Sequence, residues 1–128
     1  MAKTLTVIFG VILVLLGALG FVSNPLIGAN ALFAADAMHN IVHIIMGAVL
    51  LLVAFWYGGR SELWLKIIGA VIFLLGLIGL MTVPSTGGSL LGLAYTNGAS
   101  NWFHLVAGVF VFVALIYGRE ERQPPPAV

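Results

Sequence analysis

The sequence predicts an all-α membrane protein, a four-transmembrane-helix bundle made of two tandem, parallel two-helix repeats. The first observation is composition: 62% of the 128 residues are hydrophobic and 7% are charged, whereas about a quarter are charged in soluble proteins. The second is that the apolar residues form four runs close to the ~20 residues that cross a bilayer. The third is that the two halves of the chain share a pattern of glycine, proline, asparagine and histidine. We expect membrane spans over residues 5–22, 37–57, 63–82 and 101–117.

The first half of the chain contains two of these spans. The first follows Lys3 and fits a secretory signal peptide loosely, but a matching run in mid-chain, where no signal acts, argues against cleavage. Asn24-Pro25 marks a turn in the loop over residues 23–36. Asp36 is expected to cap the second helix at its N-terminus, and Gly58-Gly59 ends that helix.

The second half repeats this plan. A short polar turn precedes the third span, which ends before Val83-Pro84, and a loop without charged residues follows. The fourth span ends at Gly118, and the proline-rich residues after it cannot continue a helix. We therefore assign residues 1–118 to the membrane domain, with repeats over 5–58 and 64–118, and residues 119–128 to a polar cytoplasmic tail.

Positive charge is confined to one side of the predicted bundle. The cations lie at the N-terminus, in the middle turn and at the C-terminus: Lys3, Arg60, Lys66, Arg119 and Arg122. Because cytoplasmic segments carry the excess of Lys and Arg, both termini and the middle turn are expected in the cytoplasm. The loops over 23–36 and 83–100 then face outward.

The repeat is defined by residues that interrupt the apolar runs. Four residues in the first half recur 59 positions later, and three recur 61 positions later. The recurring pairs are Gly10/Gly69, Gly17/Gly76, Gly20/Gly79, Pro25/Pro84, Asn40/Asn101, His43/His104 and Gly47/Gly108. We expect the glycines to allow close helix packing, as small residues do in membranes.

The motif N-x-x-H-x-x-x-G therefore occurs twice, at residues 40–47 and 101–108. With these motifs the chain resembles a family of small bacterial four-span membrane proteins that is catalogued as a domain of unknown function. The resemblance covers nearly the whole chain. It implies a four-span fold in a bacterial plasma (inner) membrane and implies no reaction.

The polar residues at the outer ends of the second and fourth spans have three interpretations. The third, proton or small-solute movement, is disfavoured because the helices beneath the histidines are almost purely apolar. Asp36, His39 and His43 share one helix face by their i, i+3, i+7 spacing, and the repeat places His43 and His104 at the same depth. In the first interpretation Asn40, His43, Asn101 and His104 form a structural polar clasp that needs no cofactor. Such contacts contribute roughly 0.6 kcal/mol each.

The second interpretation is a ligand site. Asp36, His39, His43 and His104 offer nitrogen and oxygen ligands to a divalent metal ion. Alternatively, His43 and His104 ligate one haem from opposite sides, although four short, glycine-packed helices leave little room for a macrocycle.

The composition of the chain excludes several classes of function. The chain has no cysteine and a net charge of +1, so thiolate chemistry is excluded and no nucleic-acid partner is expected. The pattern contains no paired carboxylates and no nucleophile–base arrangement, so we expect no enzyme. The preferred role is that of a structural, accessory or assembly subunit in contact with lipid. Self-association or membership of a larger complex is expected through Phe73, Phe110 and Phe112.

Overall fold

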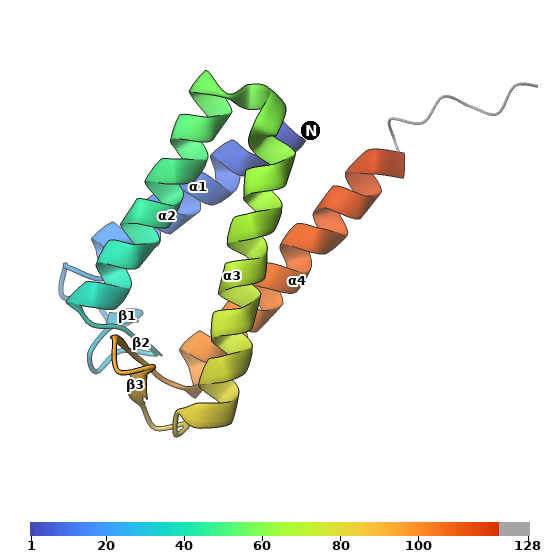
Figure 1. The fold of residues 1–128 in the computed structure, drawn as a ribbon. Helices are drawn as coiled ribbons and strands as arrows, with labels where there is room; N and C mark the ends of the chain where they lie inside the picture. Colours follow the sequence, from blue (N-terminus) through green and yellow to red (C-terminus); the bar gives the residue numbers. More distant parts are fainter. Residues whose placement is uncertain (121–128) are drawn as a thin grey trace, which may run out of the picture.

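Four long helices form a bundle in the computed structural model, which describes residues 1–120, with side chains through residue 118 (Figure 1). All four are long and apolar enough to cross a membrane, which confirms the predicted spans apart from small shifts at their ends. A single 3₁₀ turn, η1 (Gly58–Arg60), joins the second helix to the third. The tail predicted from residue 119 begins inside the last helix, and residues 121–128 lie outside the described part. The helices are α1 (Ala2–Leu19), α2 (Ala37–Trp56), α3 (Ser61–Thr82) and α4 (Gly98–Glu120).

The helix boundaries at the loops follow from side-chain capping. The Asp36 carboxylate accepts a hydrogen bond from the His39 backbone N–H at 2.9 Å, which confirms the expected cap of α2. The Asn97 side-chain oxygen accepts from the Ser100 backbone N–H at 3.0 Å and caps α4 in the same way. At the end of α1, the Asn24 side-chain amide donates to the Leu19 carbonyl at 2.9 Å.

The helices pack as two close pairs, α1 with α2 and α3 with α4. Glycine permits each pairing, as the sequence predicts. A methyl group at Gly47 would lie 2.6 Å from the Gly10 carbonyl oxygen, and one at Gly108 would lie 2.9 Å from the Gly69 carbonyl oxygen. Both separations are too short for a real side chain, so each pair brings backbone against backbone.

Between the two pairs lies one apolar core. It draws on all four helices and includes Leu50, Leu65 and Val111, which are almost completely inaccessible. The outward faces of the helices are also apolar, as a lipid-facing surface requires. The buried members of the core are Leu13, Met46, Leu50, Leu65, Ile68, Ile72, Val111 and Leu115.

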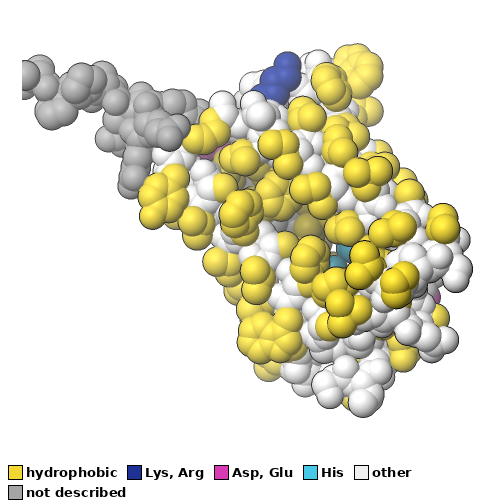
Figure 2. Space-filling view, turned by 180° about the vertical axis from the view of Figure 1, so that it is seen from behind, with side chains coloured by type: hydrophobic (Ala, Val, Ile, Leu, Met, Phe, Trp, Pro, Cys, Tyr) yellow, Lys and Arg dark blue, Asp and Glu magenta, His cyan; other side chains and the backbone are white. Residues whose placement is uncertain are grey.

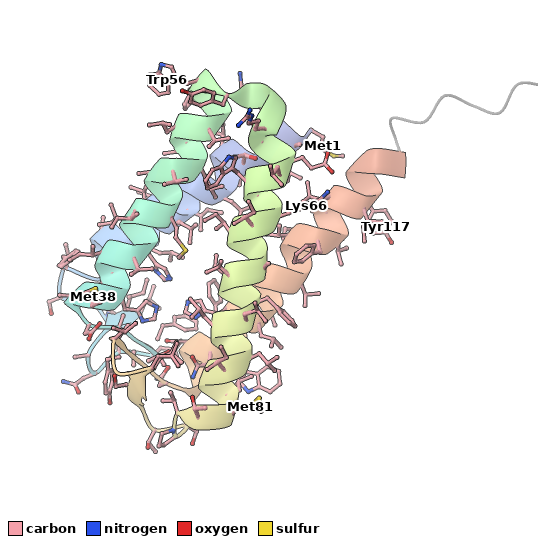
Figure 3. The ribbon with its side chains drawn as sticks, viewed as in Figure 1. Met1, Met38, Trp56, Lys66, Met81 and Tyr117 are labelled. Carbon is pink, nitrogen blue, oxygen red and sulfur yellow. The ribbon has the colours of Figure 1, made fainter. Side chains whose placement is uncertain are left out.

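The two ends of the bundle differ in character. One end, which we call the terminal end, carries Met1, Trp56, Lys66 and Tyr117 (Figure 3). The opposite end, which we call the loop end, is formed by the segments over residues 20–36 and 83–97 and has no Lys or Arg. The charge asymmetry of the sequence is therefore an asymmetry between the two ends of the bundle.

Short strands occur where the sequence predicts plain loops. β1 (Ile27–Gly28) pairs in parallel with β2 (Phe33–Ala34), and β3 (Gly88–Leu90) pairs in antiparallel with β4 (Ala94–Thr96). Residues of all four strands are buried against the helix ends. Buried backbone groups need hydrogen-bond partners, and pairing within each loop supplies them.

Candidate functional site

Three buried histidines meet at the loop end of the bundle. His39 and His43 lie one turn apart on α2, and His104 lies on α4. Their side chains are 7%, 8% and 9% exposed, respectively. One ring nitrogen from each lies within 4.8 Å of one from each of the others, so two helices that are not neighbours in sequence build one compact cluster.

His43 and His104 face each other directly, as the repeat predicts. Their Nε2 atoms are 3.2 Å apart, and the two rings are nearly perpendicular, at 89°. The His39 ring packs beside both, with centroid distances of 4.7 Å to His43 and 5.2 Å to His104. All three imidazoles are therefore mutual neighbours.

The orientation of His39 is fixed by the second half of the chain. Its Nδ1 atom lies 2.8 Å from the carbonyl oxygen of Tyr95, in β4. A carbonyl oxygen only accepts hydrogen bonds, so Nδ1 carries the proton and donates. In the neutral ring Nε2 then keeps a free lone pair, which is how a metal-binding histidine is usually prepared by a backbone carbonyl.

The second half makes the reciprocal contact with a different side chain. Ser100 occupies the position in α4 that corresponds to His39, and its hydroxyl donates to the Ala34 carbonyl at 3.1 Å. Ala34 in turn corresponds to Tyr95, since both pairs are 61 residues apart. Each half therefore anchors the first turn of its second helix on the strand of the other half.

Asn40 and Asn101 lie next to the cluster in tightly filled sites. A methyl group at Gly20 would collide with the Asn40 side-chain amide, and one at Gly79 would collide with that of Asn101. Asn101 Oδ1 accepts a hydrogen bond from the Thr96 hydroxyl at 3.0 Å. Within the described residues, Asn40 Oδ1 and Asn101 Nδ2 have no hydrogen-bond partner.

Asp36 is placed apart from the ring nitrogens. One of its carboxylate oxygens caps α2, and the residues whose ligand atoms converge are the three histidines. Of the four residues proposed as metal ligands, the structure thus brings together His39, His43 and His104. The structure gives Asp36 the role of a helix cap.

Apolar cavities surround the cluster. Two of them, of about 190 and 150 Å³, are each lined in part by all three histidines. A larger cleft of about 440 Å³ between α1 and α4 reaches His43 and His104. Figure 2 shows this face of the molecule, with histidine atoms visible in a hollow among apolar side chains.

A family model covers nearly the whole of this arrangement. It matches residues 3–117 and is described as a domain of unknown function (DUF4383). The chain belongs to the DUF4383 family. Searches of curated proteins and of solved structures return no match. The matched residues include parts of all four helices, and DUF4383 itself supplies no activity for the histidine cluster.

The sequence does not predict three hydrogen bonds that lie in the histidine cluster or close to it. They involve the Tyr95 carbonyl, the Ser100 hydroxyl and the Thr96 hydroxyl. The 61-residue offset could have identified Ser100, because it makes Ser100 the equivalent of His39 in the second repeat. No sequence signal identifies a backbone carbonyl as a partner, since every residue has one.

Proposed function

We propose that this chain is an accessory membrane protein that binds a divalent transition-metal ion through His39, His43 and His104. Neutral imidazole is the commonest protein ligand for such ions, and it suits zinc, copper, iron and nickel. The role is binding within the membrane, without catalysis. The convergence of three buried ring nitrogens from two helices carries this proposal.

The separation of two of the nitrogens matches that of metal ligands. Two nitrogens bound tetrahedrally to zinc at 2.0–2.1 Å are about 3.3 Å apart, and His43 Nε2 and His104 Nε2 are 3.2 Å apart. The three ligand atoms span up to 4.8 Å, so the widest pair closes by rotation of a ring when an ion binds. Three histidines leave a fourth position open to water or a small ligand.

A purely structural clasp would depend on a single hydrogen bond between the two rings. In the contact between the two Nε2 atoms, one ring donates and the other accepts, and the accepting ring must carry its proton on Nδ1. Among the described residues, Nδ1 of both His43 and His104 lacks a partner. A buried unpaired donor costs about 1–3 kcal/mol. An ion on both Nε2 atoms would leave both Nδ1–H groups unpaired, so its coordination bonds have to outweigh that cost.

A haem bound between His43 and His104 fits this geometry poorly. The macrocycle would have to lie between the two rings and extend outward in all directions. The His39 ring already occupies one of these directions, with its centroid within 5.2 Å of both other rings. A single ion needs only the space where the nitrogens converge, so the arrangement favours an ion.

We further propose a bacterial plasma-membrane location with both termini and η1 in the cytoplasm. Lys3 in the first turn of α1, Arg60 in η1 and Lys66 near the start of α3 all lie at the terminal end, which supports this orientation. The histidine cluster would then lie near the outer surface. The recurring capping, glycine and histidine positions support an origin by tandem duplication.

We also propose association with another copy or with a larger complex. Large apolar side chains are exposed along α4, including Phe110 and Phe112, at 58% and 37%. The bundle is small, so its lipid-facing surface is large relative to the core it encloses. A partner subunit would cover part of this apolar surface, which lipid otherwise covers.

The test is metal binding by the purified full-length protein in detergent. After removal of bound metal with a chelator, Zn²⁺ should bind at one ion per chain and raise the melting temperature. Zinc at 100 times its Kd should stabilise the fold by about 2.7 kcal/mol. The double variant His43→Ala/His104→Ala should lose both effects.

The matched control is Ser100→Ala. Ser100 lies at the α4 position that corresponds to His39 and makes the reciprocal contact, yet it has no place in the ligand set. This variant should bind zinc as the wild type does. Equal zinc stoichiometry in the wild type and in the double histidine variant would overturn the proposal. The histidine cluster would then be interpreted as a structural polar clasp.

A further inference from the structure

A second cleft follows α2 toward the terminal end, where η1 and Trp64 of α3 complete its wall. It has a volume of about 440 Å³ and extends along α2 from Ile45 to Tyr57, so that its mouth lies at the terminal end. Its walls are apolar except at the mouth, where η1 contributes Arg60. Its lining comprises Ile45, Ala48, Val49, Leu52, Val53, Tyr57, Arg60 and Trp64.

Among the residues whose side chains are described, no carboxylate pairs with the charge at the mouth of this cleft. Lys66, at the same end, forms a salt bridge with Glu62 at 2.8 Å. Arg60 has no salt bridge to any described side chain, and it is exposed. A guanidinium offers paired N–H donors that match the oxygens of a phosphate, so the mouth is suited to an anion.

The aromatic residues place the cleft at the membrane surface. Tyr57 and Trp64 both line it, and Trp56 lies at the same end of the bundle (Figure 3). Tyr and Trp concentrate at the level of lipid headgroups. The arginine therefore lies at headgroup level, and the apolar walls extend from there into the hydrocarbon region.

We propose that this cleft binds an anionic phospholipid, with an acyl chain along α2 and the phosphate on Arg60. An apolar groove that ends in an exposed arginine complements such a lipid in both charge and polarity. The site is separate from the histidine cluster, and the proposal does not depend on metal binding.

Tryptophan fluorescence provides the test, because Trp64 lines the cleft. A Trp56→Phe/Trp102→Phe background leaves Trp64 as the remaining tryptophan of the three in the chain. This protein is reconstituted with brominated phosphatidylglycerol or brominated phosphatidylcholine, whose bromine atoms quench nearby indoles. We expect phosphatidylglycerol to bind about fivefold more tightly, the effect of roughly 1 kcal/mol per interfacial cation.

Arg60→Gln should abolish this preference, and Lys3→Gln should preserve it. The control removes an equal charge from the same end, and Lys3 does not line the cleft. Competition of the brominated lipid by unbrominated phosphatidylglycerol and phosphatidylcholine requires no change at Arg60, so the proposal stays testable even if Arg60→Gln does not fold. Equal competition by the two lipids, or an unchanged preference in folded Arg60→Gln, would overturn the proposal.

Discussion

His43 on α2 and His104 on α4 face each other at 3.2 Å between their Nε2 atoms. The two residues hold corresponding positions in the two halves of the chain, 61 residues apart. Their contact is therefore the point where the two helix pairs meet at the loop end. His39 has no histidine counterpart, because Ser100 occupies that position, and it makes the cluster a set of three imidazoles.

The glycine contacts predict a sharp local sensitivity. Gly47→Ala places a methyl group 2.6 Å from the Gly10 carbonyl oxygen and 2.8 Å from the Val14 nitrogen. Overpacking of this kind costs about 1–3 kcal/mol, which outweighs the gain of roughly 0.5–1 kcal/mol in helix propensity. Thermal melts in detergent should show the loss.

Gly59→Ala is the control for this substitution. A methyl group there meets no atom within 4 Å, so its melting temperature should equal that of the wild type or exceed it slightly. A Gly47→Ala protein as stable as Gly59→Ala would mean that α1 and α2 do not pack backbone against backbone.

The reciprocal contacts between the halves predict a second effect on stability. Ser100→Ala removes the hydrogen bond to the Ala34 carbonyl and leaves a buried acceptor unpaired, which should cost about 1–3 kcal/mol. Ser89 is an exposed serine on β3, and Ser89→Ala should change stability by less than about 0.5 kcal/mol. Indistinguishable melting of the two variants would argue that the Ser100 contact does not join the halves.

The sequence predicts the helices well because their signals are local. Length and hydropathy define each span, and Asp36 marks the start of α2 through its capping side chain. The sequence predicts the end of the first span at residue 22, whereas α1 ends three residues earlier, at Leu19. The hydrophobic run continues through Phe21 and Val22. The helix nevertheless ends at Leu19, where the Asn24 side-chain amide donates a hydrogen bond to the Leu19 carbonyl and the loop begins.

The site could be predicted in part. The repeat places His43 opposite His104, and helix periodicity brings His39 onto the same face as His43. The same periodicity places Asp36 on that face, yet its carboxylate is used by the first turn of α2. The strand that supplies the Tyr95 carbonyl depends on pairing between Ser89 and Tyr95 within a loop, and no apolar periodicity indicates such short strands.

The proposed orientation predicts the outcome of topology reporters. Fusions at Gly28 and Gly87, which lie in the two segments of the loop end, should report an external location. Fusions at Gly59 and Val128 should report a cytoplasmic one, because the cations cluster there. An external signal at Gly59 would reverse the orientation.

The proposed association predicts the result of crosslinking in native membranes. A dimer or a larger species should appear at protein levels near those of normal expression. Phe110→Ala removes a side chain that is 58% exposed on α4, and it should weaken that species while the melting temperature changes little. Monomer alone at every protein concentration would contradict the association.

The most direct test of the metal site is X-ray absorption spectroscopy of the zinc-loaded protein. The account predicts three imidazole nitrogens at about 2.0–2.1 Å, with one further light ligand. His39→Ser, which installs the residue found at the corresponding position of α4, should reduce the imidazole count from three to two. Zinc surrounded only by oxygen ligands, or an imidazole count that His39→Ser leaves unchanged, would contradict the proposed site.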